Sequence, residues 1–126
     1  MALIREIREI PQVGSRTPWG NAQEATEMAP GIILVDTPSH GGFWLSMKRL
    51  QAMPPALRAI GNESKSHEPG WFEEDCEAVA VVHAFPEVFE GRFKDGSILA
   101  TAAGRLEFLG HWYPDAVAAL GRGAAK

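Results

Sequence analysis

The stretch that most constrains the fold is residues 31–45, GIILVDTPSHGGFWL. It opens with an apolar run at residues 32–35. A run of this length that is rich in β-branched side chains and bounded by turn residues predicts a buried strand. After a polar turn the chain becomes apolar again at residues 43–45, which predicts a second strand and a hairpin. His40 stands directly before two glycines, whose backbones accept tight conformations that a Cβ would forbid. We therefore expect this histidine to be held on a specific turn.

Helical spacing of apolar residues predicts that helices surround this hairpin. Thr17 is a suitable N-cap with Pro18 at the first helical position, and Ser46 is a suitable N-cap for a later helix. The expected helices cover residues 3–10 (with a strand as the alternative), 18–28, 47–53, 56–60, 71–85, 98–109 and 116–120. The expected fold class is therefore α+β, with a small two-stranded antiparallel hairpin packed against several helices in a single domain.

The chain is expected to comprise three parts. An N-terminal segment, residues 1–16, holds the short helix or strand and a linker, residues 17–120 form the single α+β domain, and residues 121–126 form a disordered tail. A chain of 126 residues is long enough for one hydrophobic core. Within the domain, the polar residues 62–70 are expected to form a loop.

Composition and charge narrow the classes of protein. No apolar run approaches the roughly 18 residues of a membrane span, and the single cysteine, Cys76, cannot form an internal disulfide. We therefore expect a cytoplasmic protein without membrane association. The net charge of −4 differs from that of dedicated nucleic-acid binders, which usually carry a basic face, so we expect no direct nucleic-acid binding. We predict no cofactor, because the glycine-rich phosphate-binding motifs are absent.

Most of the negative charge falls in one segment, residues 63–90. This segment holds eight acidic residues and one lysine, whereas the chain before and after it carries a small excess of basic residues. A concentrated charge of one sign can steer an oppositely charged partner more strongly than the net charge suggests. The simpler interpretation of such a segment is a solvated helix face.

Several short motifs occur in order along the chain. They are Pro18-Trp19-Gly20 followed by Gln23, Ala29-Pro30-Gly31-Ile32, His40-Gly41-Gly42, and Trp71-Phe72-Glu73-Glu74-Asp75-Cys76. In this order they resemble an uncharacterised bacterial family that occurs in phages, plasmids and larger mobile-element proteins. The resemblance covers about residues 17–120. It implies a mobile-element setting and carries over no activity.

The favoured hypothesis is a non-enzymatic protein-binding module of a phage or mobile element. Through an acidic patch it would occupy a basic surface of a host protein, such as a CRISPR or restriction complex. It would thus inhibit a host defence complex in the manner of an anti-CRISPR or anti-restriction protein, with aromatic side chains anchoring the partner. The expected partner-binding residues are Glu68, Glu73, Glu74, Glu77 and Trp44. The sequence leaves the oligomeric state open.

The alternative hypothesis is a small hydrolase or metal-dependent enzyme with its site at His40 and residues 73–76. Its catalytic residues would be His40, Asp75 and Cys76, with the histidine as the base that generates a thiolate. Its metal ligands would be His40, Glu74 and Asp75. Two features oppose this hypothesis: carboxylates flanking a cysteine raise the pKa of its thiol, and the familiar metal-ligand spacings are absent. We therefore predict neither a metal nor a catalytic residue.

A third interpretation assigns these residues a structural role. Trp19, His40 and Asp75 would then bond to one another in the interior of a structural or self-associating domain. Because ordered motifs fit this role as well as they fit catalysis, the positions of these side chains discriminate between the interpretations.

Overall fold

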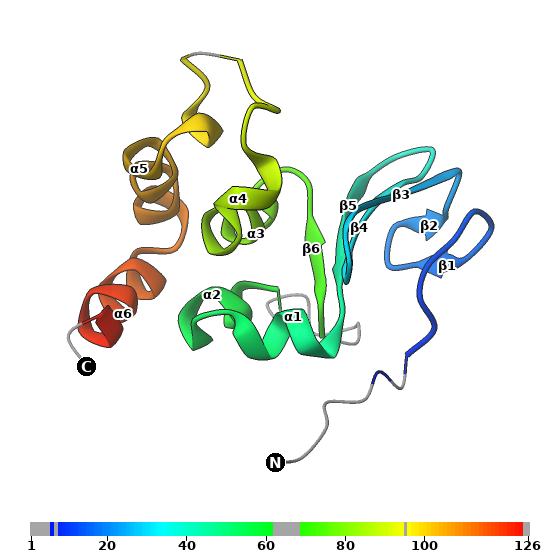
Figure 1. Ribbon diagram of the computed structural model, residues 1–126, viewed down its shortest axis with the longest axis horizontal. Helices are drawn as coiled ribbons and strands as arrows, with labels where there is room; N and C mark the ends of the chain where they lie inside the picture. Colours follow the sequence, from blue (N-terminus) through cyan, green and yellow to red (C-terminus); the bar gives the residue numbers. More distant parts are fainter. Residues whose placement is uncertain (1–5, 7, 62–68, 95, 125–126) are drawn as a thin grey trace.

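The computed structural model describes residues 6, 8–61, 69–94 and 96–124, which form one mixed α and β domain (Figure 1). The strands are β1 (Arg16–Thr17), β2 (Gly20–Asn21), β3 (Glu24–Ala29), β4 (Ile32–Asp36), β5 (Gly41–Leu45) and β6 (Trp71–Glu73). The helices are α1 (Met47–Ala52), α2 (Pro55–Ile60), α3 (Ala78–Ala84), α4 (Pro86–Phe89), the 3-10 helix η1 (Ile98–Ala100), α5 (Ala102–Trp112) and α6 (Pro114–Ala124). β1 and β2 form a two-stranded ribbon, and the other strands form a four-stranded antiparallel sheet in the order β3-β4-β5-β6.

The predicted hairpin is confirmed and lies at the centre of the larger sheet. β4 pairs with β5 in a register that places Ile32 opposite Leu45 and Asp36 opposite Gly41, so the turn between them carries His40. The α+β class is also confirmed. The sheet is larger than predicted, because β3 and β6 extend the hairpin on both sides and β1–β2 adds a second sheet.

The helix predicted over residues 18–28 is wrong, because this segment forms β2, β3 and the turns around them. The Thr17 hydroxyl does accept a hydrogen bond from the backbone amide of Trp19, but it also donates to the carbonyl oxygen of Gly20. These bonds close a tight turn between β1 and β2 instead of starting a helix. Glutamate and alanine in β3 favour helices locally, but pairing with β4 satisfies the backbone of both strands and outweighs that preference.

The first part of the helix predicted over residues 71–85 is also wrong. Residues 71–73 form β6, residues 74–77 form a turn, and α3 begins at Ala78. Trp71 and Phe72 are both buried although consecutive strand residues point to opposite faces, which is the pattern of a strand covered on both sides. The acidic residues before α3 resemble the acidic first turn of a helix, and this resemblance led to the wrong prediction.

The predictions for α1 and α2 are confirmed to within two residues. Ser46 is the N-cap of α1, and its hydroxyl accepts a 3.1 Å hydrogen bond from the backbone amide of Arg49. The helix predicted over residues 98–109 is divided, because Thr101 ends η1 and caps a separate α5. In α1, η1 and α5 alike, the hydroxyl of a serine or threonine caps the first turn and sets where the helix begins.

The chain termini differ from the predictions. α6 continues to Ala124, so part of the predicted tail at residues 121–126 is helical. Of the helix predicted over residues 3–10, the described residues 6 and 8–10 are not helical. Most of the predicted loop, residues 62–68, lies outside the described residues. No helix in the described ranges has both the length and the apolar character needed to span a bilayer.

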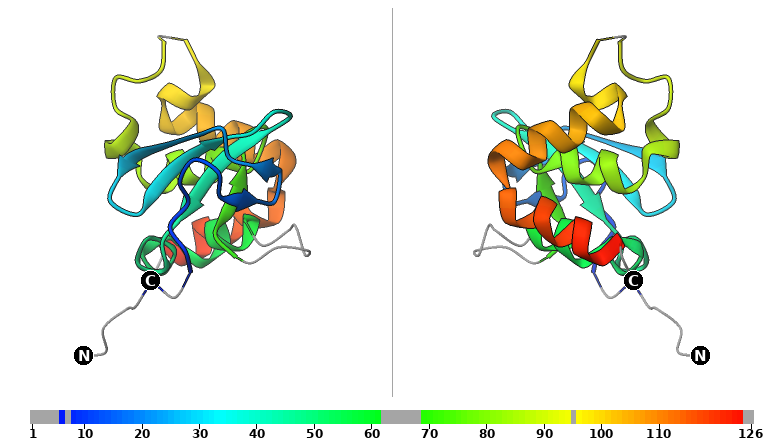
Figure 2. Two further views of the ribbon diagram at one scale, coloured as in Figure 1. Left: turned by 90° about the vertical axis from the view of Figure 1, so that its right-hand side faces the viewer. Right: turned by 90° about the vertical axis from the view of Figure 1, so that its left-hand side faces the viewer.

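Apolar side chains cover both faces of the four-stranded sheet. On one face, Phe43, Leu45 and Phe72 pack in one hydrophobic cluster with apolar side chains of the helices. On this side α5 and α6 form the outer layer (Figure 1; Figure 2, right). On the other face, Trp44 and Trp71 pack with a smaller set of residues beneath the β1–β2 ribbon. The central strands are therefore buried on both sides, which is why residues 32–35 and 43–45 are all apolar.

Glu6 and Arg8 fasten the segment before β1 to the start of α1. The Glu6 carboxylate accepts a 2.6 Å hydrogen bond from the backbone amide of Met47 and forms a 3.0 Å ion pair with Arg8. The Arg8 guanidinium lies 4.7 Å from the centre of the Trp44 ring. Burial pulls the pKa of Glu6 upward, but the hydrogen bonds from Met47 and Arg8 and the Arg8 charge outweigh it, so the pKa lies below its ordinary value.

Candidate functional site

His40 lies on the turn between β4 and β5, and Thr37 holds this turn in place. The hydroxyl of the buried Thr37 accepts a 3.2 Å hydrogen bond from the backbone amide of His40. The same hydroxyl lies 2.7 Å from the carbonyl oxygen of His40 and 3.1 Å from that of Trp19, which are its two available acceptors. The His40 side chain is exposed. The turn therefore fixes the backbone of His40 while its imidazole faces solvent.

Gly42 lets two other parts of the chain approach the turn. A Cβ at this position would lie 2.2 Å from the carbonyl oxygen of Phe72 and 2.6 Å from Cη2 of Trp19. β6 and the Trp19 ring therefore occupy the space that any other side chain would need. This crowding explains why a glycine follows the turn here.

Gly41 brings two carboxylates close to the hairpin. A Cβ on Gly41 would lie 3.0 Å from Oδ1 of Asp36 and 3.1 Å from Oε2 of Glu74. In addition, the backbone amide of Glu74 donates a 2.9 Å hydrogen bond to the carbonyl oxygen of Gly41. This bond continues the β5–β6 pairing by one residue beyond Glu73 and fixes the first residue of the acidic turn.

Glu77 closes the turn that leads from β6 to α3. Its Oε1 accepts a 3.0 Å hydrogen bond from the backbone amide of Glu73. The turn is thus held at both ends, by Gly41 on one side and by Glu77 on the other. Such a turn presents its side chains in a defined arrangement.

This turn brings Glu73 and Asp75 to His40. One potential ligand atom of each residue lies within 4.8 Å of the other two, and no hydrogen bond joins the imidazole to either carboxylate among the described residues. Transition-metal ions bind imidazole and carboxylate ligands at about 2 Å, so small side-chain rotations would let all three bind one ion. The predicted alternative set was His40, Glu74 and Asp75. In the structure Glu73 takes the place of Glu74, whose carboxylate lies beside Gly41.

Cys76 is not part of this three-residue group. It is half-buried, and burial raises the pKa of its thiol, with further increases from the negative charges of Asp75, Glu73 and Glu77. A raised pKa leaves less of the nucleophilic thiolate. The geometry therefore gives no support to catalysis by His40, Asp75 and Cys76.

The acidic face consists of Asp36, Glu73, Glu74 and Asp75, at the end of the sheet where β5 begins and β6 ends. Within the described ranges, none of these four carboxylates forms an ion pair with a lysine or arginine. Sequence reasoning missed Asp36. The signal that could have identified it was its position opposite Gly41 in the predicted hairpin.

The other predicted partner-binding residues have different positions. Trp44, which was expected to contact a partner, is only 1% exposed. It lies in the central strand β5, and the Arg8 guanidinium covers its ring. Glu68 lies outside the described residues. Glu77 is half-buried and bonds to the backbone of Glu73.

The interpretation in which Trp19, His40 and Asp75 bond to one another in the interior is also wrong. His40 and Asp75 are exposed, and only Trp19 is partly buried. Trp19 instead makes an edge contact with Trp71, with ring centres 5.6 Å apart. The structural role of these motif residues is thus divided: Trp19 packs against the sheet, while His40 and Asp75 are available at the surface.

No curated protein and no solved structure matches the chain. A family model described as a domain of unknown function, DUF7007, matches residues 12–125. The match includes both sheets, every helix of the described residues and the acidic face, whereas Glu6 and Arg8 precede it. The predicted resemblance to an uncharacterised domain family is confirmed in this form. The chain belongs to the DUF7007 family, a domain of unknown function.

Proposed function

We propose that this protein is a non-enzymatic binding module whose acidic face contacts a basic surface of a partner protein. The observation that carries the proposal is the gathering of four carboxylates at one end of the sheet, without a lysine or arginine partner among the described residues. Like charges held together repel one another in the free protein, and a basic partner would convert this repulsion into attraction.

The backbone beneath the acidic face supports a surface formed before binding. The amide of Glu74 is bonded to Gly41, the amide of Glu73 is bonded to Glu77, and Thr37 fixes the turn that precedes Gly41. A surface that is ordered in the free protein loses less conformational entropy when the complex forms.

The narrower proposal concerns the partner. The ordered sequence motifs resemble those of mobile-element proteins, and a basic surface that normally binds nucleic-acid phosphates is complementary to clustered carboxylates. We therefore propose a host nucleic-acid-targeting defence complex, of the CRISPR or restriction type, as the partner. Binding would inhibit that complex by occupying its basic surface.

Removing the charges of the acidic face tests the proposal. The triple variant Glu73→Gln, Glu74→Gln, Asp75→Asn keeps the side chains nearly the same size. Binding to purified CRISPR and restriction complexes is measured by calorimetry at two salt concentrations. We expect wild-type affinity to fall with salt, and the triple variant to bind at least roughly tenfold more weakly with little salt dependence.

A matched control removes the same number of charges elsewhere. Glu9→Gln, Glu27→Gln and Glu107→Gln lie at exposed positions before β1, on β3 and on α5. This control should bind as the wild type does. Equal losses in both triple variants would show that net charge, and not the acidic face, drives binding. Absence of wild-type binding to every complex tested would remove the narrower proposal.

A second candidate function is binding of a divalent metal ion by His40, Glu73 and Asp75. The observation that favours it is that one potential ligand atom of each residue lies within 4.8 Å of those of the other two. Imidazole with two carboxylates suits zinc, manganese or iron better than calcium or magnesium. An ion at this position would add positive charge to the acidic face and so oppose the first proposal, which makes the two proposals distinguishable.

Calorimetric titration with zinc and manganese chloride tests this second candidate. His40→Ala should abolish saturable binding, whereas His111→Ala, at an exposed position on α5, should leave it unchanged. Wild-type protein that shows no saturable heat at millimolar metal would exclude the ion site and leave the partner-binding proposal untouched.

A further inference from the structure

We propose that the cavity between α4, η1 and α5 binds a small monocarboxylate with an apolar tail, and that Arg105 is the group that receives its charge. The cavity has a volume of about 390 Å³, which lies within the roughly 300–1,000 Å³ typical of small-molecule sites. It is lined by residues of a different part of the fold from the acidic face, so this inference does not depend on the proposed function.

Arg105 is a buried cation with only neutral partners. It is 6% exposed, its Nε donates a 3.1 Å hydrogen bond to Nδ1 of His83, and its Nη1 donates a 2.9 Å hydrogen bond to the carbonyl oxygen of Leu99. Because Nδ1 accepts this hydrogen bond, the His83 ring is neutral. Burial, together with the Arg105 charge, correspondingly lowers the pKa of His83. Neither partner neutralises the guanidinium.

The third nitrogen of Arg105, Nη2, has no hydrogen-bond partner within the described ranges. Arg105 also forms no ion pair with a carboxylate of the described residues. Arginine is almost never buried this deeply without a negatively charged partner. Hydrogen bonds to neutral groups could tether α5, but they do not explain a charge at this position. A bound carboxylate would supply the missing negative charge and a partner for Nη2.

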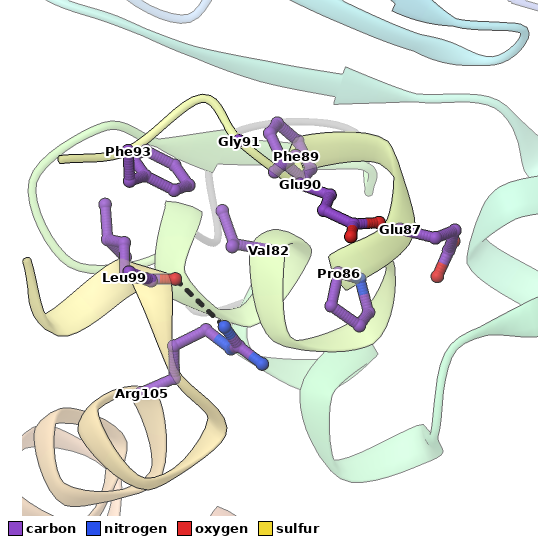
Figure 3. Close-up of a pocket in the computed structure, with 10 residues that line it drawn as sticks. Val82, Pro86, Glu87, Phe89, Glu90, Gly91, Phe93, Leu99 and Arg105 are labelled. Atoms are coloured by element: carbon purple, nitrogen blue, oxygen red, sulfur yellow. Dashed lines mark hydrogen bonds between the residues drawn. The ribbon is translucent and has the colours of Figure 1, made fainter. Parts of the chain in front are cut away.

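Apolar side chains form part of the cavity wall. Figure 3 shows Phe89 and Phe93 across the cavity from Arg105, with Val82 and Leu99 between them. The rings of Phe89 and Phe93 are stacked, with centres 6.3 Å apart. Such walls favour a hydrocarbon chain, because burying its surface removes it from water.

Two acidic residues restrict the ligand to a single negative charge. Glu87 and Glu90 line the same cavity and are exposed at its rim. Their charges would repel a phosphate or a dicarboxylate more strongly than a monocarboxylate whose charge is paired with Arg105. The combination of one buried cation, apolar walls and an acidic rim therefore points to an alkanoate or a similar apolar monocarboxylate.

Titration of the full chain with octanoate tests the proposal. We expect saturable binding by calorimetry, with affinity rising roughly three- to fourfold per methylene group from butanoate to hexanoate. Octanol, which has the same chain without the charge, should bind at least roughly tenfold more weakly. Wild-type protein that shows no saturable binding of octanoate at millimolar concentration, or that binds octanol equally well, would overturn the proposal.

Variants locate the site. Arg105→Gln should weaken octanoate binding at least roughly tenfold, and Phe93→Ala should weaken it severalfold by removing one wall. The control Arg92→Gln changes an exposed arginine of the neighbouring loop and should bind as the wild type does. Unchanged binding by folded Arg105→Gln would overturn the assignment. If that variant does not fold, Phe93→Ala and the comparison with octanol decide the outcome.

Discussion

The backbone amide of Glu74 donates a 2.9 Å hydrogen bond to the carbonyl oxygen of Gly41. The bond joins the acidic turn after β6 to the first residue of β5, directly after His40. Because β5 also pairs with β4, this contact brings together residues 36, 40 and 73–75 from two distant parts of the chain. The candidate site therefore depends on the pairing of β6 with β5.

Substitution of Gly42 tests this pairing. Gly42→Ala should destabilise the protein by about 1–3 kcal/mol, because the added methyl group would overlap the carbonyl oxygen of Phe72 and the Trp19 ring. Urea unfolding followed by tryptophan fluorescence measures the effect. Gly110→Ala is the control: it lies within α5 with open space around it and should stabilise the protein by about 0.5–1 kcal/mol. A Gly42→Ala protein as stable as the wild type would show that β6 is not held so closely.

The Thr37 hydroxyl is expected to determine how firmly the His40 turn is held. Thr37→Val keeps the shape of the side chain but leaves the amide and carbonyl of His40 and the carbonyl of Trp19 without this partner. We expect a loss of about 1–3 kcal/mol in the free energy of unfolding. Thr37→Ser retains the hydroxyl and should lose less. Equal losses in the two variants would mean that packing of the methyl group, and not the hydrogen bonds, stabilises the turn.

Glu6 should contribute stability that depends on pH. Its pKa lies below the ordinary value of 4.5, so the folded protein favours the carboxylate more strongly than the unfolded chain does. The contribution is complete above that value and is lost as the pH falls through the lowered pKa of the folded state. Glu6→Ala should cost about 1 kcal/mol at neutral pH, because the amide of Met47 loses its cap.

Acid unfolding of Glu6→Ala provides the measurement. The difference in stability from the wild type should shrink as the pH falls through the lowered pKa. The exposed neighbour Glu9 serves as the control, and Glu9→Ala should stay close to wild type throughout. A Glu6→Ala difference that stays constant with pH would contradict the assigned charge effect.

The hydrogen bond from Arg105 to Nδ1 of His83 predicts a second pH dependence. Here the folded protein favours the neutral form of the side chain, whereas for Glu6 it favours the charged form. Burial, with the Arg105 charge, holds the pKa of His83 below its ordinary value of 6.5. Between these two values the unfolded chain binds more protons than the folded protein does. The stabilising contribution is therefore complete above 6.5 and is lost as the pH falls towards the lowered pKa.

The variant His83→Gln separates this effect from other titrations. The glutamine oxygen can still accept from Arg105 but does not titrate, so the stability of His83→Gln should change less between about pH 7 and pH 5 than that of the wild type. His111→Gln, at an exposed position on α5, should keep the wild-type dependence. Equal pH dependence in His83→Gln and the wild type would contradict the prediction.

Cys76 is expected to react slowly with alkylating reagents. Burial and the neighbouring carboxylates raise the pKa of its thiol, so less thiolate is present at any pH near neutrality. The rate of reaction with iodoacetamide at about pH 8 should be lower in the folded protein than in the urea-unfolded chain, where an ordinary thiol pKa applies. A faster reaction in the folded state would contradict this prediction and support the hypothesis that Cys76 is a catalytic nucleophile.

The candidate site was only partly predictable. The turn at His40 and the acidic residues at 73–75 were visible in the sequence, but their proximity was not, because it results from strand pairing between segments about 30 residues apart. Asp36 was missed although its hairpin register was predictable. Arg105 was missed because no local pattern distinguishes an arginine that becomes buried from one on a helix surface.

The sequence by itself determined the β4–β5 hairpin and the starts of α1 and α2, because these depend on short-range signals: an apolar run, turn residues and a capping serine. Only the tertiary structure decided that residues 24–29 and 71–73 are strands. The glutamates and alanines of residues 24–29 favour a helix locally, and the acidic residues that follow Phe72 resemble the first turn of a helix. Pairing with the edges of the hairpin made both segments strands. It also decided that Trp44 is buried and that His40, Glu73 and Asp75 meet. The physical reason is that backbone pairing and burial against distant segments outweigh local preferences of a few tenths of a kcal/mol per residue.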